Sequence, residues 1–232
     1  MTQTTYLARR GQLQTYFDRT AVEAWARLTS DAPVSRIRAT VRAGRDSMRQ
    51  TILDWLPSDL TGMRLLDAGC GTGALAVEAA KRGAAVVAID LSPKLVAVAR
   101  ERMPTFSGTG HIEFRSGDML DASLGRFDYA VAMDSLIHYR AADMADAVAR
   151  LASRVDQGIV FTFAPRTPAL TVMHVVGQLF PRGDKSPAIE PVGHGAITKR
   201  LRSHPALSAW HLGRTQRINS GFYISQALEV VR

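Results

Sequence analysis

The sequence predicts an α/β protein with a doubly wound sheet, in which parallel strands alternate with helices. Through the middle third of the 232 residues, short apolar runs alternate with helical patterns, as expected for βαβ units. A glycine-rich turn, residues 69–73, directly follows the first of these strands. Acidic residues then stand at the ends of later strands, where open α/β sheets bind their ligands. The sequence thus predicts a ligand site at the carboxyl edge of the sheet.

Each element has a signal of its own. Strands are indicated by apolar runs, and the helix expected after the second strand begins with Ser92 as N-cap and Pro93 at its first position. The expected order from the turn onward is a strand at 63–67, helix 74–82, strand 85–90, helix 92–103, strand 112–115, strand 127–133, helix 141–154, strand 159–163, helix 170–180, loop 181–195, helix 197–202 and strands 209–217 and 222–230.

Two further helices are expected before this core, over 20–28 and 34–56. In the second, Arg38, Arg42, Arg45 and Arg49 follow one another at steps of four, three and four, so they share one helix face. Such a row either faces water or presents cations to an acidic ligand. We therefore divide the chain into an N-terminal helical arm or cap, 1–58, and a core, 59–232, with 165–203 as an inserted substrate lid.

Composition narrows the class of protein. Apolar residues make up 46% and charged residues 22% of the chain, which is usual for a folded globular protein. No apolar run is long enough to span a bilayer, and residues 1–10 lack the features of a secretory signal. The single cysteine, Cys70, excludes an intramolecular disulfide and a multi-cysteine metal site. We expect a protein of the reducing cytoplasm.

The net charge of +8 resides in the two flanks of the chain. Residues 1–60 hold nine basic and six acidic side chains, 61–163 hold eleven and twelve, and 164–232 hold nine and three. A basic flank suits an acidic substrate, a nucleic acid or an anionic membrane surface. The sequence-derived pI of 10.2 therefore leaves an RNA methyltransferase or an RNA-binding module as an alternative, although the flanks lack aromatic recognition motifs.

The turn Asp67-Ala68-Gly69-Cys70-Gly71-Thr72-Gly73 carries the strongest signal. Its glycines permit a tight turn and close approach of a ligand to the backbone. The turn alone also satisfies a dinucleotide-binding fingerprint, and Asp90 suits a ribose hydroxyl in either case. A nicotinamide-dependent oxidoreductase is thus a second alternative, although no acid–base constellation for it is recognisable.

The turn, Asp90, Gly117-Asp118 and Asp134 together resemble, in order, the motifs of class I S-adenosylmethionine-dependent methyltransferases. This resemblance covers about residues 63–163 and implies a seven-stranded Rossmann-like sheet whose last two strands form a hairpin. It implies S-adenosylmethionine as cofactor and S-adenosylhomocysteine as product. The cofactor-binding residues expected from it are Asp67, Gly69, Cys70, Gly71, Gly73, Asp90, Leu91, Asp118, Met119, Met133 and Asp134.

Short sequence motifs narrow the class of substrate. The tetrapeptide Met133-Asp134-Ser135-Leu136 replaces the Asn/Asp-Pro-Pro-aromatic motif of common amino-methylating nucleic-acid enzymes. Short motifs over nearly the whole chain instead resemble magnesium-protoporphyrin IX methyltransferases of (bacterio)chlorophyll synthesis. They are Tyr16-Phe17, Trp25, Ile37-Arg38, Leu136-Ile137-His138-Tyr139, Phe163-Ala164-Pro165-Arg166-Thr167-Pro168, Leu179-Phe180-Pro181, Lys185-Ser186-Pro187 and Phe222-Tyr223-Ile224-Ser225.

The resemblance implies methyl transfer to a propionate carboxylate of magnesium protoporphyrin IX, giving the monomethyl ester, with catalytic roles for His138 and Tyr16. We expect Arg38, Arg42, Tyr139 and Arg166 to bind the substrate, since arginine pairs with carboxylates and stacks on flat π systems. The magnesium belongs to the substrate, and no protein-bound metal is expected. The porphyrin-binding subunit of magnesium chelatase is a plausible partner, and contact with a photosynthetic membrane would be peripheral at most. Another acidic small molecule remains an alternative substrate.

Overall fold

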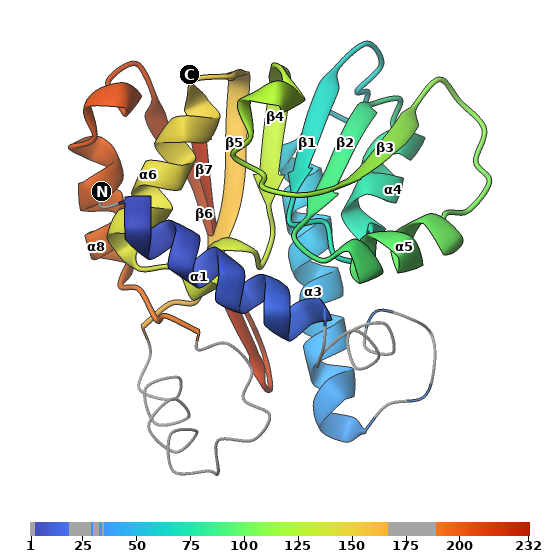
Figure 1. Cartoon of the computed structure of the whole chain (residues 1–232), viewed down its shortest axis with the longest axis horizontal. Helices are drawn as coiled ribbons and strands as arrows, with labels where there is room; N and C mark the ends of the chain where they lie inside the picture. Colours follow the sequence, from blue (N-terminus) through green and yellow to red (C-terminus); the bar gives the residue numbers. More distant parts are fainter. Residues whose placement is uncertain (1–2, 19–28, 30–32, 34, 167–188) are drawn as a thin grey trace.

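The structure is a computed structural model that describes residues 3–18, 29, 33, 35–166 and 189–232. Its centre is a seven-stranded sheet of order β3-β2-β1-β4-β5-β7-β6, drawn with its helices in Figure 1. Strands β1 to β5 are parallel, and β7 lies antiparallel between β5 and β6. This confirms the doubly wound, seven-stranded fold and its closing hairpin.

The elements follow the expected order. The strands are β1 (Arg64–Ala68), β2 (Ala85–Asp90), β3 (His111–Ser116), β4 (Phe127–Ala132), β5 (Val155–Phe163), β6 (His211–Ser220) and β7 (Tyr223–Val231). The helices are α1 (Gln3–Tyr16), α3 (Arg36–Trp55), α4 (Ala74–Lys81), α5 (Pro93–Glu101), α6 (Ala141–Ala152) and α8 (His194–Arg202), with short 3-10 helices η2 (Ala122–Leu124), η3 (Leu136–His138) and η4 (Pro205–Leu207).

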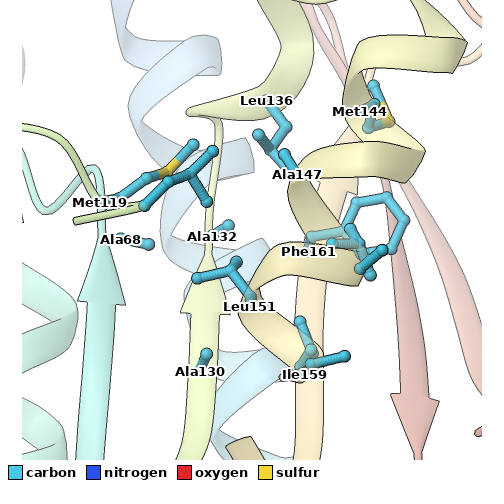
Figure 2. Close-up of a cluster of buried hydrophobic side chains, with 14 of the residues drawn as sticks. Ala68, Met119, Ala130, Ala132, Leu136, Met144, Ala147, Leu151, Ile159 and Phe161 are labelled. Atoms are coloured by element: carbon cyan, nitrogen blue, oxygen red, sulfur yellow. The ribbon is translucent and has the colours of Figure 1, made fainter. Parts of the chain in front are cut away.

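The sheet separates two hydrophobic cores, because successive side chains of a strand point to opposite faces. On one face, strand residues pack with α6 and α8; Figure 2 shows part of this core, in which Ile159 and Phe161 of β5 lie near Leu151 of α6. On the other face, Leu65 and Val131 belong to a core with α3, α4 and α5. With both faces covered, the edge where the parallel strands end is left for a site.

Helix α1 is the main difference from the sequence-based expectation, which placed only an arm there. Among its residues whose burial is described, 5–16, it buries Tyr6 and Leu13, two turns apart, so the apolar periodicity is too sparse to indicate a helix. Helix α8 begins three residues earlier than expected and lies inside the segment assigned to the lid. Its Ile197 and Leu201 belong to the core with α6. The expected helices at 20–28 and 170–180, and the loop up to residue 188, lie outside the described residues.

Candidate active site

A pocket lies at the carboxyl edge of the sheet, with about 690 Å³ of empty space that includes part of the open solvent at its mouth. The sheet supplies its floor from the glycine turn and the ends of β2, β3 and β4. Helices α1 and α3 supply further walls. The lining residues are Tyr6, Leu13, Phe17, Arg45, Gly69, Gly71, Ile89, Asp90, Leu91, Leu95, Gly117, Met119, Met133, Asp134, Ser135, His138 and Tyr139. Residues spread over most of the chain thus converge on one ligand-sized space.

The glycine turn brings bare backbone to the pocket. Gly69 has φ of 91°, and a Cβ there would come within 2.4 Å of the Ser135 Cβ. Any side chain at this position would therefore be strained and would collide with the turn after β4. The Gly71 amide donates to Asp90 Oδ2 at 2.9 Å, and the Ser92 amide donates to Asp90 Oδ1 at 2.9 Å. Asp90 consequently fixes the turn from the end of the neighbouring strand.

Two carboxyl groups adjoin this turn: Asp67 is buried, and Asp90 is partly buried and lines the pocket. Burial and the nearby Asp90 raise the pKa of Asp67 to about 7, against smaller opposing effects of the Ala76 amide and Arg45. Burial also raises the pKa of Asp90, although the amides of Ser92 and Gly71 oppose that rise. Among the described side chains, Asp67 Oδ2 is a buried oxygen with no hydrogen-bond partner. Beside the pocket, the described side chains thus leave one buried carboxyl oxygen without a hydrogen bond.

Helix α1 is tied to the acidic residue that follows β3. The Tyr6 hydroxyl donates to Asp118 Oδ1 at 2.8 Å, and Arg10 forms an ion pair with Asp118 Oδ2 at 2.8 Å. The Leu120 amide donates to the same carboxylate at 2.9 Å. The Tyr6 ring stacks on Tyr139, with centroids 5.1 Å apart. These contacts join α1 to the turns after β3 and β4, and Figure 1 shows α1 running along that edge of the sheet.

Asp134 connects the end of β4 to three other elements. Its carboxylate accepts from Arg45 of α3 at 2.6 Å, from the Tyr223 hydroxyl of β7 at 3.1 Å and from Thr162 of β5 at 3.1 Å. Its φ of 55° is the one positive value outside glycine in the described chain, and asparagine and aspartate tolerate that region better than most residues. The buried network therefore holds a sharp turn directly before Ser135 and His138.

His138 lies at the end of η3 with 6% of its surface exposed, and it lines the pocket. Its ring makes an edge contact with Phe17, with centroids 6.1 Å apart. Tyr16 makes a similar contact with Phe17 at 5.3 Å but does not line the pocket itself. The two residues expected to be catalytic are thus joined through Phe17, and His138 alone of the two faces the space.

The expected site residues divide into three sets. Nine of them line the pocket: Gly69, Gly71, Asp90, Leu91, Met119, Met133, Asp134, His138 and Tyr139. Asp67, Cys70, Gly73 and Asp118 lie around it, and Asp118 lines an adjoining smaller pocket with Arg10. Arg38, Arg42 and Arg166 lie outside the lining of both.

The arginine of the row that lines the pocket lies further along α3 than the two that were expected to bind the substrate. Arg45, not Arg38 or Arg42, lines it, because two helical turns advance the chain by about 10 Å. The helical spacing placed Arg45 on the face of α3 that carries the arginine row. It could not predict which arginine of that face reaches the pocket. Tyr6, Leu13 and Phe17 were missed because α1 was not expected.

Comparisons with known proteins agree with this geometry. A family model described as "Magnesium-protoporphyrin IX methyltransferase C-terminus" matches residues 132–232, and a "Methyltransferase domain" model matches residues 65–158. The chain is 49% identical to a magnesium-protoporphyrin O-methyltransferase of Rhodobacter capsulatus, covering 97% of each chain. It is 31% identical to one from Synechocystis, covering 94% of each.

Solved structures give the same result. The crystal structure of magnesium protoporphyrin IX methyltransferase (ChlM) from Synechocystis with bound SAH superposes with a TM-score of 0.82 at 29% identity, covering 96% of this chain and 99% of that one. The cyclopropane synthase MmaA2 from Mycobacterium tuberculosis has a TM-score of 0.71 at 16% identity, covering 96% and 98%. The latter likeness concerns the fold alone.

Proposed function

The chain belongs to the magnesium-protoporphyrin IX methyltransferase family, and we propose that it methylates one propionate carboxylate of magnesium protoporphyrin IX. The products are the monomethyl ester and S-adenosylhomocysteine, in (bacterio)chlorophyll biosynthesis. The observation that carries this proposal is 49% identity to a magnesium-protoporphyrin O-methyltransferase over 97% of both chains. The enzyme is an S-adenosylmethionine-dependent O-methyltransferase.

The residues at the carboxyl edge fit S-adenosylmethionine. Bare backbone at Gly69 and Gly71 admits a ligand closely, and Asp90 offers carboxylate oxygens at the position suited to ribose hydroxyls. The buried Asp67 oxygen beside the turn has no partner among the described side chains, which indicates that a polar ligand group or a water completes the contacts there. When bound, S-adenosylmethionine supplies an electrophilic methyl group on a sulfonium. Cys70, Gly73, Leu91, Asp118, Met119, Met133 and Asp134 complete the proposed cofactor residues.

Methyl transfer to a carboxylate requires mainly that the carboxylate oxygen and the methyl group are aligned. A propionate is ionised near neutral pH and therefore already has its nucleophilic oxygen. The chain has to hold that oxygen in line and keep water away from it. His138, buried and facing the pocket, is the group that we propose to orient the carboxylate, or to accept its proton if the pocket keeps it protonated.

Tyr16 and the substrate-binding residues complete the proposal. Tyr16 acts next to His138 through Phe17, with which it makes an edge contact. Tyr139 lines the pocket beside Tyr6. Arg38, Arg42 and Arg166, which lie outside the pocket lining, would meet the acidic edge of a macrocycle that extends beyond it.

Location and partners follow from the same family assignment. We propose that the enzyme works in the cytoplasm and receives its substrate from the porphyrin-binding subunit of magnesium chelatase. Any membrane contact would be peripheral. Within the described residues, no helix has the length and apolar character needed to cross a bilayer. The basic flanks suit an anionic surface or an anionic substrate.

The test is a methyl-transfer assay with S-adenosylmethionine and magnesium protoporphyrin IX, with the products identified by mass spectrometry. We expect a single added methyl group with the wild-type chain and a large loss of rate, about 100-fold, in His138→Ala. Tyr16→Phe should lose less, since it keeps the ring against Phe17. Binding of S-adenosylhomocysteine should remain in both variants.

Two outcomes would contradict the proposal. Wild-type protein that binds S-adenosylhomocysteine but yields no methyl ester would overturn the substrate and direct the search to other carboxylates and RNA. Wild-type rates in His138→Ala, with normal cofactor binding, would remove the catalytic role of His138 and leave the activity in place.

A further inference from the structure

Arg9 of α1 contacts the turn that carries His138 without lining the pocket. Its Nε donates to the backbone carbonyl of His138 at 2.9 Å, and its Nη2 forms an ion pair with Glu190 Oε1 at 2.9 Å. The side chains of Arg9 and Glu190 are 24% and 34% exposed. The planar guanidinium thus uses two of its donors to join two segments at the back of His138.

Glu190 lies at a junction of the chain. Its amide donates to the Ile137 carbonyl at 2.9 Å, one residue before His138. Two residues later, the Val192 amide donates to Ala164, and its carbonyl accepts from the Arg166 amide. Hydrogen bonds therefore join the chain just before residue 167 to the chain just after residue 188. Glu190 then joins this pair of segments to the turn that carries His138.

The turn itself needs such support. It is a single 3-10 turn, and the last carbonyls of a helix have no partner within the helix. The Arg9 donor satisfies the His138 carbonyl with a charge-assisted bond, which is stronger than a neutral one. On the other side of His138, the ring of Tyr6 stacks on Tyr139. Helix α1 thus holds the residue after His138 as well as His138 itself.

We propose that Arg9, through Glu190 and the His138 carbonyl, is a positioning residue for methyl transfer. It fixes the turn from which the His138 ring enters the pocket and joins that turn to the chain at Glu190. Arg9 touches neither cofactor nor reacting atoms in this role. The inference rests on the proposed function and adds to it a residue distant in sequence from every motif of the core.

The adjacent residue on α1 provides a matched comparison. Arg10 pairs with Asp118 on the cofactor side, whereas Arg9 pairs with the catalytic turn. Removing the Arg10 guanidinium should weaken binding of S-adenosylhomocysteine. Removing that of Arg9 should leave this affinity within about two-fold of wild type, because its partners, the His138 carbonyl and Glu190, are not among the residues proposed to bind the cofactor. Neighbouring arginines of one helix are thus expected to affect different kinetic parameters.

The experiment compares Arg9→Met, Arg9→Lys, Glu190→Gln and Arg10→Met, with Arg49→Met as a control, since Arg49 pairs with Asp46 within α3 and lines neither pocket. Affinity for S-adenosylhomocysteine is measured by calorimetry, and kcat and KM for magnesium protoporphyrin IX at saturating S-adenosylmethionine. We expect Arg9→Met to lower kcat about 10-fold, since small misplacements of catalytic groups are costly. Lysine should not restore it, because one ammonium does not reproduce the fork.

The Arg9–Glu190 connection is tested by combining the two changes. If both act through one unit, Arg9→Met with Glu190→Gln should be no slower than Arg9→Met alone by more than about two-fold. Unchanged kcat in Arg9→Met, full rescue by lysine, or additive losses would each overturn the inference. So would a loss of S-adenosylhomocysteine affinity in proportion to kcat, which would indicate general loosening of α1. A wild-type chain that makes no product would overturn the proposed function and this inference with it.

Discussion

Asp67 illustrates how a single buried residue can be held at a cost to stability. It is 2% exposed, and one of its oxygens has no partner among the described residues. Its neighbour Asp90 is a second, partly buried carboxyl group with a raised pKa. Taking charge out of water without pairing it is unfavourable, and the raised pKa expresses that cost. Such a cost is expected where a ligand rather than the chain completes the polar contacts.

We predict that Asp67→Asn makes the ligand-free protein more stable at alkaline pH. The folded-state pKa of about 7 lies above the ordinary value of 3.8, so between these values the folded chain holds a proton that the unfolded chain has released. The free energy of unfolding of the wild type therefore falls as the pH rises from the ordinary pKa to the folded-state pKa. Above the folded-state pKa, Asp67 causes no further fall. The variant lacks this loss and should gain on the order of 4 kcal/mol over wild type between pH 4 and 8.

Urea unfolding of both proteins at a series of pH values measures this difference. Asp59→Asn is the matched control of opposite sign, because hydrogen bonds from Thr61 lower the pKa of the exposed Asp59. That variant should be the less stable one at neutral pH, and the difference should shrink as the pH falls through the ordinary value. A pH-independent difference between Asp67→Asn and wild type would show that Asp67 titrates normally.

At the scale of elements, the buried parallel strands carried the clearest signal. Strands β1, β2, β4 and β5 bury most of their residues, so their apolar runs identified them from sequence within a few residues. Helix α1 escaped because Tyr6 and Leu13 are its two buried apolar side chains, and its role rests on polar contacts to residues more than 100 positions away. Acidic residues at strand ends were predictable from the strand pattern. Their partners Tyr6, Arg10 and Arg45 were not, since long-range pairing leaves no local signal.

We predict that Leu13→Ala loosens α1 without unfolding the sheet. Leu13 is 3% exposed and is one of the few apolar anchors of the helix. Truncating a buried leucine costs about 2–5 kcal/mol, and a helix with so few anchors should open locally rather than globally. Hydrogen exchange of the α1 amides in ligand-free protein should therefore accelerate by about 30-fold or more, with the amides of β1 and β4 unchanged.

Leu7→Ala on the same helix is the control, since Leu7 is 45% exposed and its truncation should leave exchange nearly as in wild type. Equal acceleration in the sheet and in α1 would mean that the helix is an integral part of the cooperative unit.

Across the whole molecule, charge is distributed so that the ends of the chain are basic and the middle is nearly balanced. The excess of basic residues lies in 1–60 and 164–232, and the segment between them has eleven basic and twelve acidic residues. The sheet core that binds the cofactor is thus nearly neutral, while the segments expected to meet the substrate carry the positive field. A field of this kind raises the rate of encounter with an anion and contributes little once the anion is bound in place.

We therefore predict that kcat/KM for the dianionic porphyrin falls several-fold as salt is raised from about 20 mM to about 500 mM, while kcat at saturation changes little. Salt screens the approach of separated charges, whereas a bound carboxylate close to its partners is screened much less. Binding of the uncharged dimethyl ester of the same porphyrin, measured by fluorescence, should show almost no salt dependence. If kcat fell in parallel with kcat/KM, the flank charges would act at the bound carboxylate itself. An identical salt response for the diester would instead assign the effect to stacking of the macrocycle, and the basic flanks would have no part in capturing the substrate.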